Sequence, residues 1–339
     1  MEDLIRFGFR PSNLPLKQED EKRRHQAHVE KVLSFTHSSA SLDQERKALD
    51  ALWRTELLTG RELVMTDQMH RLWSEYGLPS SFVRGIMWPW SATKLTLPPG
   101  TSASEAADQK FSSLIDLDLK RTLPFLGICN HDDSMRKSKS VLIRFSSNFP
   151  AIGYTQGMSY ICTRLMLELN FDENKTYNCL QYIIVHSQTL SCLYRLNLDE
   201  IRETVELVLD SIAWENIPTL WLALKKINFK MMDYCLIEYM ITMYVKHFNL
   251  RISGFIFDQF FLSGDQALYQ AAIGILSLLE QKVLVLLEKK ADIEEICELF
   301  TNANSLIEFS EFTKAFSDVL ISDSSRELMD KLLLHPSGK

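Results

Sequence analysis

Arg121 and Gln156 are the two side chains in this sequence whose types and settings are best suited to chemistry. Arg121 ends the segment Ile115-Asp116-Leu117-Asp118-Leu119-Lys120-Arg121, and Gln156 lies in the segment Gly153-Tyr154-Thr155-Gln156-Gly157. A fixed guanidinium and a fixed amide are groups that a phosphoryl-transfer transition state needs, the first to stabilise charge and the second to position a water. We therefore interpret the rest of the chain as the scaffold that holds these two groups.

The first segment has a spacing of three between Ile115, Asp118 and Arg121. On a helix this spacing gives the three side chains neighbouring positions on one face, so we expect Asp118 to hold Arg121 by a charge-assisted hydrogen bond. Pro124 requires the helix to stop near Thr122, which leaves Arg121 at a helix end beside a loop. The alternative is an ordinary surface pair that contributes about 0.2–0.5 kcal/mol.

The second segment places Gly153 and Gly157 on either side of Tyr154 and Gln156. Glycines allow backbone conformations that other residues resist, or the close approach of another part of the chain. The alternative is a simple helix-start turn, with Tyr154 packed inward and Gln156 solvated. The sequence contains no GxxxxGK[ST] and no GxGxxG after a strand, so we see no nucleotide pocket of its own.

Taken together, these segments resemble the signature of TBC domains, the GTPase-activating domains for Rab GTPases. The resemblance rests on Ile115-x-x-Asp118-x-x-Arg121-Thr122 and on Gly153-Tyr154-x-Gln156-Gly157-Met158. It extends to an entry segment, Arg84-Gly85-x-x-Trp88, and to a later segment, Phe257-Asp258-x-Phe260-Phe261, in which Phe257 stands where the family usually has tryptophan. In all, the resemblance covers residues 49–320.

The resemblance implies a role for each matching residue. Arg121 stands at the family's arginine finger, which would reach the β- and γ-phosphates of GTP held by a partner. Gln156 stands at its glutamine finger, which would orient the attacking water. Asp118 would fix Arg121, and Tyr154 would help to set the position of Gln156. The remaining matches would support the site or mark the domain: Ile115, Gly153, Gly157, Arg84, Trp88 and Asp258.

The implied activity is acceleration of GTP hydrolysis by a Rab-type small GTPase in its GTP-bound form, a function in vesicle trafficking. The protein would supply both fingers in trans and would not itself be a nucleotide hydrolase. GTP and Mg²⁺ would be carried by the partner, so we expect no cofactor or metal of its own. The alternative is a non-catalytic adaptor that binds a small GTPase or a trafficking complex through the same helical groove. Loss of a finger residue would favour the adaptor, and both finger residues are present.

Composition places limits on the class of protein. The net charge is −7, which argues against a general nucleic-acid binder and gives no help to direct binding of anionic membranes. Six cysteines occur singly, as expected for buried thiols in a reducing cytosol.

The N-terminus has no apolar signal region, and charged residues interrupt the apolar stretch at 273–287, which we expect not to span a bilayer. We expect a cytoplasmic protein that reaches endomembranes, if at all, through its partner.

Helical patterning dominates the 339 residues, with 12 glycines and 10 prolines, about half their usual frequencies. The apolar spacing predicts helices over 42–58, 63–76, 110–122, 137–149, 156–169, 173–189, 199–212, 216–227, 231–248, 251–262, 265–288, 291–301 and 308–320. No run alternates as a strand does, so we expect an all-α, irregular multi-helix fold with no β-sheet. We divide the chain into an N-terminal arm and helix (1–48), the main domain (49–320), and a C-terminal helix and tail (321–339).

Residues 301–312 have a weak similarity to a calcium-binding loop, but they lack the leading aspartate and the glycine at the sixth position. We interpret this stretch as a helix–turn–helix near the end of the domain.

Overall fold

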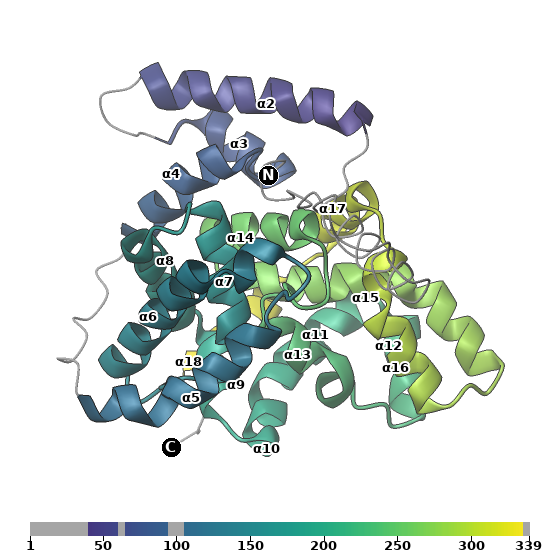
Figure 1. Cartoon of the computed structure of the whole chain (residues 1–339). Coiled ribbons are helices and arrows are strands. Elements are labelled where there is room, and N and C mark those ends of the chain that lie inside the picture. The colour runs from purple at the N-terminus through teal and green to yellow at the C-terminus, as the bar shows by residue number, and fades with distance from the viewer. Residues whose placement is uncertain (1–39, 60–64, 94–104, 335–339) are drawn as a thin grey trace, which may run out of the picture.

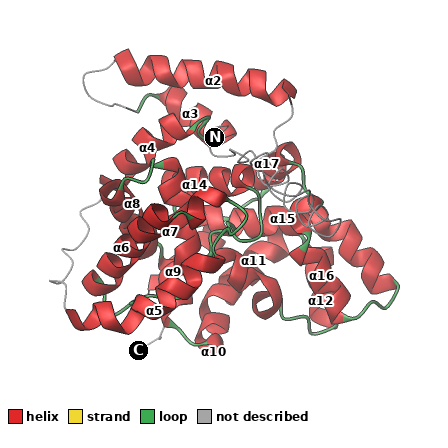
Figure 2. Ribbon diagram, in the orientation of Figure 1, coloured by secondary structure: helices red, strands yellow, loops and turns green. Residues whose placement is uncertain are grey.

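The protein is built from helices, and the computed structural model describes residues 40–59, 65–93 and 105–334 (Figures 1 and 2). No strand occurs in these ranges, which confirms the predicted all-α fold. Residues 1–39, which include most of the expected N-terminal arm and helix, lie outside the described residues.

The helices follow one another with short connections. In chain order they are α2 (Ala40–Thr59), α3 (Asp67–Tyr76), α4 (Ser81–Thr93), α5 (Glu105–Arg121), η2 (Gly127–Asn130), α6 (Asp132–Asn148), α7 (Met158–Glu168), α8 (Glu173–His186), α9 (Gln188–Arg195), α10 (Leu198–Ile201), η3 (Arg202–Glu206), α11 (Leu207–Asn216), α12 (Pro218–Lys226), η4 (Met232–Leu236), α13 (Ile237–Ile241), α14 (Leu250–Ser263), α15 (Gln266–Glu288), α16 (Ile293–Thr301), η5 (Ala303–Ser305), α17 (Phe309–Asp318) and α18 (Asp323–Leu334).

Helix α14 lies at the centre of the core and is buried along almost its whole length. It contacts α3, α4, α15 and α17, which surround it (Figure 1). A helix that is apolar on every side must be buried in this way. Asn249 begins the helix by accepting hydrogen bonds from the backbone N–H groups of Arg251 and Ile252. The core therefore forms around the segment that carries Asp258.

Helix α15 is long and apolar enough, by length and composition, to cross a membrane. It runs from Gln266 to Glu288 and so extends beyond the stretch 273–287 that we expected not to span a bilayer. It packs against α11, α12, α14, α16 and α17, and the face from Ala267 to Val283 is buried. The buried face of this helix therefore belongs to the helical core.

Helix α2 lies along one side of the molecule, next to α3 and α4 (Figure 1). Trp53 is buried and meets the ring of Trp73 edge-on, with the centroids 6.2 Å apart. This aromatic contact ties the first described helix to the domain. At the other end of the chain, α18 packs against α9, α11 and η3.

The helix predicted over 231–248 is wrong in its second half. Helix α13 ends at Ile241, and Met243 and Tyr244 adopt positive φ angles of 45° and 64°. No glycine or proline marks this turn. It is stabilised instead by burial of Tyr244 and Phe248, and the Tyr244 hydroxyl donates to the carbonyl of Leu268 at 2.6 Å. Tertiary packing therefore overrides the helical pattern here.

The helix predicted over 173–189 is also interrupted, because α8 ends at His186. Ser187 then caps a new helix, α9, by accepting a hydrogen bond from the backbone N–H of Leu190. Helix α9 was therefore not predicted as a separate element. By contrast, α16, η5 and α17 form the helix–turn–helix expected around 301–312.

Candidate functional site

Arg121 is the last residue of α5, as the position of Pro124 predicts. Ile115 and Asp118 lie on the buried face of this helix. The Arg121 side chain is 55% exposed, whereas the Asp118 side chain is 2% exposed. The helix therefore presents a cation at the surface from a support that is buried.

The Asp118 carboxylate joins the two segments singled out by the sequence. Arg121 Nη2 donates to Asp118 Oδ1, and the hydroxyl of Tyr154 donates to Asp118 Oδ2 at 2.7 Å. Behind them, the Thr122 hydroxyl donates to Ser159 Oγ at 2.8 Å, a further link between α5 and α7. One buried carboxylate thus fixes the arginine and the loop that carries Gln156 relative to each other.

Burial is the main reason why the pKa of Tyr154 is raised above its ordinary value, and the hydrogen bond to Asp118 adds to the effect. The phenol therefore stays protonated and remains a donor to the carboxylate. Tyr154 bonds to Asp118 and not to Gln156, so any influence of Tyr154 on Gln156 passes through the backbone of the loop.

The loop around Gln156 depends on its two glycines. Gly153 has a φ of 66° and Gly157 a φ of 108°. A Cβ on Gly157 would lie only 2.9 Å from the carbonyl oxygen of Ile241. Helix α7 begins after this contact, at Met158, so the prediction that Gln156 belongs to the helix is wrong. A residue with a positive φ and no room for a Cβ must be glycine.

Gln156 itself is exposed on this loop. Its side chain makes no hydrogen bond to any of the residues that the structure describes. The amide is therefore presented to solvent beside a segment that is held firmly at both glycines and at Tyr154.

A cleft of about 430 Å³ opens next to Arg121. Its near side is formed by the end of α5 and by Tyr160, whose hydroxyl donates to the carbonyl of Arg121 at 3.3 Å. Its far side is formed by Lys246, His247 and the turn at 301–305. This far side could not be predicted from the sequence, because Lys246 and His247 follow the unpredicted turn after α13 and meet residues 301–305 only through tertiary packing.

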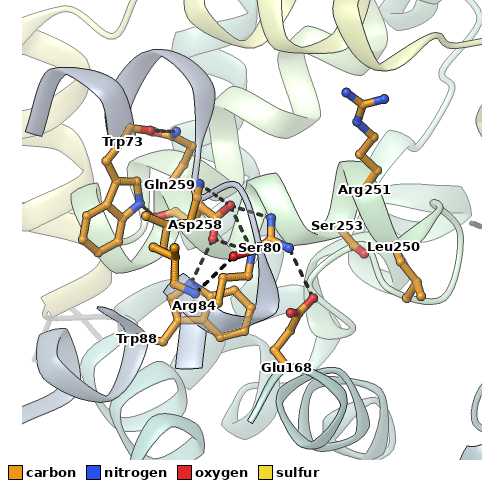
Figure 3. A network of polar contacts seen from close by, with 12 residues as sticks. Trp73, Ser80, Arg84, Trp88, Glu168, Leu250, Arg251, Ser253, Asp258 and Gln259 are labelled. Carbon is orange, nitrogen blue, oxygen red and sulfur yellow. Dashed lines mark hydrogen bonds and ion pairs between the residues drawn. The ribbon is translucent and has the colours of Figure 1, made fainter. Parts of the chain in front are cut away.

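Arg84, Trp88 and Asp258, the other matches to the family signature, form a separate cluster inside the core (Figure 3). Arg84 Nη2 and Nε donate to the two oxygens of Asp258 at 2.8 and 3.0 Å, and Trp88 Nε1 donates to Asp258 Oδ1 at 3.0 Å. Arg84 also donates to Glu168 at 3.2 Å. All four side chains are buried, so this network joins α4, α7 and α14 and has no surface for a partner.

Phe257 occupies the position next to Asp258 where we noted a departure from the family pattern. It is buried, and its ring lies against Trp88 with the centroids 5.5 Å apart. Its contacts in the described structure are those of a packing residue. Among the residues that the structure describes, no group of three or more His, Cys, Asp and Glu side chains is placed to hold a metal ion.

Comparison with known proteins identifies a family. A family model described as the Rab-GTPase-TBC domain matches residues 83–284. The relatives include TBC1 domain family member 14 of Rattus norvegicus, 26% identical over 316 residues, which are 80% of this chain and 44% of the relative. TBC1 domain family member 12 of Mus musculus is 27% identical over 327 residues, covering 81% and 45%. The chain thus spans less than half the length of either relative.

Two solved structures share the fold. The Chlamydomonas flagellar RabGAP TBC domain has a TM-score of 0.64 at 16% identity and covers 90% of this chain and 96% of its own. The Ypt/Rab-GAP domain of Gyp1p has a TM-score of 0.63 at 12% identity and covers 81% and 97%. At these identities the likeness concerns the helical architecture alone.

Proposed function

The chain belongs to the Rab-GTPase-TBC domain family, and on that premise we propose that it accelerates GTP hydrolysis by a Rab-type small GTPase. The observation that carries the proposal is the exposed Arg121 side chain held by the buried Asp118, with Tyr154 of the Gln156 loop on the same carboxylate. An exposed cation and an exposed amide, each on a fixed backbone, can be supplied together to a second molecule.

Arg121 is the electrophilic group on this proposal. As the γ-phosphoryl group leaves, negative charge builds up on its oxygens and on the bridging oxygen, and a guanidinium nearby stabilises that charge. Arg121 uses one N–H for Asp118, and a guanidinium carries five, so donors remain for phosphate oxygens. Asp118 is its positioning residue, because the hydrogen bond limits the rotamers that Arg121 can adopt.

Gln156 is the group that orients water. Its amide can accept a hydrogen bond from the attacking water through the carbonyl oxygen and donate one to a phosphate oxygen through the NH₂ group. The backbone contact of Gly157 with Ile241 fixes the loop from which the Gln156 side chain extends before the partner arrives. Such preorganisation is what allows a polar group to lower a barrier without reorganising during the reaction.

The nucleotide and Mg²⁺ belong to the partner on this proposal, which supplies its GTP-bound form as the substrate. The two fingers complete a site of which the partner holds the other half. Any association with endomembranes then runs through the partner.

The test is single-turnover GTP hydrolysis by a panel of GTP-loaded Rab-type GTPases, with and without this chain. We expect at least one GTPase to be accelerated. Gln156→Ala should slow that reaction by about 10²–10³-fold, the range for loss of one transition-state hydrogen bond. Gln281→Ala, which removes an exposed glutamine on α15, is the matched control and should change nothing. The double variant with Arg121→Ala should fall little below Arg121→Ala alone, because both groups serve one transition state.

The adaptor alternative gives a different result in the same experiment. The names of the two TBC1 domain family relatives state a domain and no activity, so the experiment must also be able to detect an adaptor. An adaptor would bind a GTP-loaded partner equally well with Arg121→Ala and would never accelerate hydrolysis. If no GTPase in the panel responds to the wild-type chain, the catalytic proposal fails.

A further inference from the structure

The far side of the cleft carries a second cation, Lys246, which is also paired with a carboxylate. After α13 the chain reverses through Met243 and Tyr244, both with positive φ angles. This reversal brings Lys246 and His247 back onto Glu238, eight and nine residues earlier in the chain. The turn therefore places a lysine at the cleft wall that faces the end of α5.

Glu238 anchors this wall. It accepts hydrogen bonds from Lys246 Nζ and, at 2.8 Å, shares one with His247 Nε2. The hydrogen bond to His247 is the largest cause of a pKa of about 2 for Glu238, and Lys246 lowers it further. The carboxylate is thus ionised throughout the physiological range and pairs with Lys246, although, unlike Asp118, it is itself exposed to solvent.

The turn at 301–305 is also fixed. Asn304 Oδ1 accepts a hydrogen bond from the backbone N–H of Asn249 at 2.7 Å, which ties the turn to the start of α14. The hydroxyl of Ser305 donates to the carbonyl of Asn302 at 2.8 Å. The cleft wall around Lys246 is therefore an ordered surface.

The balance of charge in the cleft points to an anionic ligand. Among the described residues that line it, Arg121 and Lys246 are cations and none is a carboxylate. Glu238 and Asp118 pair with these cations but do not line the cleft; the Glu238 side chain is 44% exposed, whereas Asp118 is buried. An ammonium has three N–H groups, of which one bonds to Glu238, so Lys246 can donate to a further acceptor.

We propose that Lys246 binds a carboxylate side chain on the surface of the GTPase, beside the nucleotide, while Arg121 engages the phosphates. The inference rests on the proposed function and adds a partner-binding residue to the site. A lysine at 36% exposure, held at a polar rim, acts on encounter and affinity more than on the chemical step. Lys246 would thus help to decide which GTPases the protein accepts.

The experiment measures kcat and KM for the GTPase that the wild-type chain accelerates, using the full chain. Lys246→Ala should raise KM about ten- to a hundredfold, the effect of losing a hydrogen bond between charged groups, with kcat within about threefold of wild type. The salt dependence of kcat/KM should also weaken. Lys225→Ala is the matched control, because Lys225 is 40% exposed, is paired with Asp210 at 2.9 Å and does not line the cleft.

A charge reversal identifies the acceptor. Lys246→Glu should lower kcat/KM more than Lys246→Ala, and reversal of the matching carboxylate on the GTPase to lysine should restore it. A fall in kcat with KM unchanged would place Lys246 on the nucleotide phosphates and overturn the assignment to a carboxylate. An unchanged KM in a chain that still accelerates hydrolysis would overturn the inference alone. If the wild-type chain accelerates no GTPase, the proposed function and this inference fall together.

Discussion

The protein uses an arginine–aspartate pair in two regions that differ in exposure. In the core, Arg84 and Asp258 are both buried, and the pair is completed by Trp88 and Glu168 (Figure 3). At the end of α5, Asp118 is equally buried but Arg121 is more than half exposed. Both are ion pairs between a guanidinium and a carboxylate, and they differ in the exposure of the arginine and in how many of its N–H groups are used within the protein.

The two environments make opposite demands on the arginine. Arg84 donates hydrogen bonds to Asp258 and Glu168 within the protein and so joins three helices. A buried ion pair of this kind is costly to desolvate and is harmful to break, because one partner left alone is an unpaired buried charge. Arg121 spends one donor on Asp118 and keeps the others for a second molecule. The partly exposed pair Asp118–Arg121 thus positions a guanidinium for a second molecule. The buried pair Arg84–Asp258 stabilises the packing of the helices.

Replacement of Arg121 by alanine is the change with the largest expected effect. We expect GTP hydrolysis by the responsive GTPase to slow by about 10³–10⁵-fold, the range for an arginine finger supplied in trans. The free energy of unfolding should fall by only about 1 kcal/mol, because removal of the exposed Arg121 side chain would open Asp118 to water and Tyr154 would still donate to it. Single-turnover hydrolysis and chemical denaturation of the same preparation measure the two quantities.

Arg136→Ala is the control for Arg121→Ala. Arg136 is also exposed and is paired with an aspartate three residues earlier, Asp133, at 2.7 Å. Its removal should leave both activity and stability near wild type. A large loss of stability in Arg121→Ala without a large loss of rate would contradict this comparison. The Asp118–Arg121 pair would then stabilise the fold, as Arg84 and Asp258 do, and would not position a catalytic group.

Replacement of Arg84 by alanine should affect the opposite quantity. It leaves Asp258 and Glu168 buried with fewer partners, and we expect the free energy of unfolding to fall by about 3–5 kcal/mol. Urea denaturation followed by circular dichroism measures the loss. The fraction that remains folded should keep its rate per molecule, since Arg84 has no surface for a partner. A stable Arg84→Ala protein with a large loss of activity would break the comparison.

Much of the α5 side of the site could be predicted from the sequence because the signals are local. The spacing of Asp118 and Arg121 predicts their contact. Pro124 predicts that the helix ends close to Arg121, beside a loop. The contact of Tyr154 with Asp118 joins residues 36 positions apart and follows only from the packing of α5 against α7. Spacing could not show that one arginine is exposed and the other buried.

The far wall of the cleft could not be predicted, because its signal is tertiary. The apolar pattern of 231–248 is helical, and neither Met243 nor Tyr244 is a residue that favours a positive φ. The turn forms because burial of Tyr244 and Phe248 outweighs the local preference. The position of Gln156 was missed for a related reason: Gly157 ends the loop through its approach to Ile241, which is far away in the sequence.

Tyr154→Phe gives the smallest expected effect and tests how far the two halves of the site depend on their shared carboxylate. The substitution keeps the ring and removes one hydrogen bond to Asp118, so the free energy of unfolding should fall by about 1–2 kcal/mol. Tyr269→Phe is the control, because the Tyr269 oxygen is also buried and accepts a hydrogen bond, from Thr189 at 3.2 Å, away from the site. Both variants should lose similar stability, but only Tyr154→Phe should also slow hydrolysis, by roughly tenfold, since a loosened Asp118 orients Arg121 less well. Equal hydrolysis rates in the two variants would mean that Arg121 is positioned without the help of Tyr154. Asp118 would then bond to both residues, but the position of Arg121 would not depend on Tyr154.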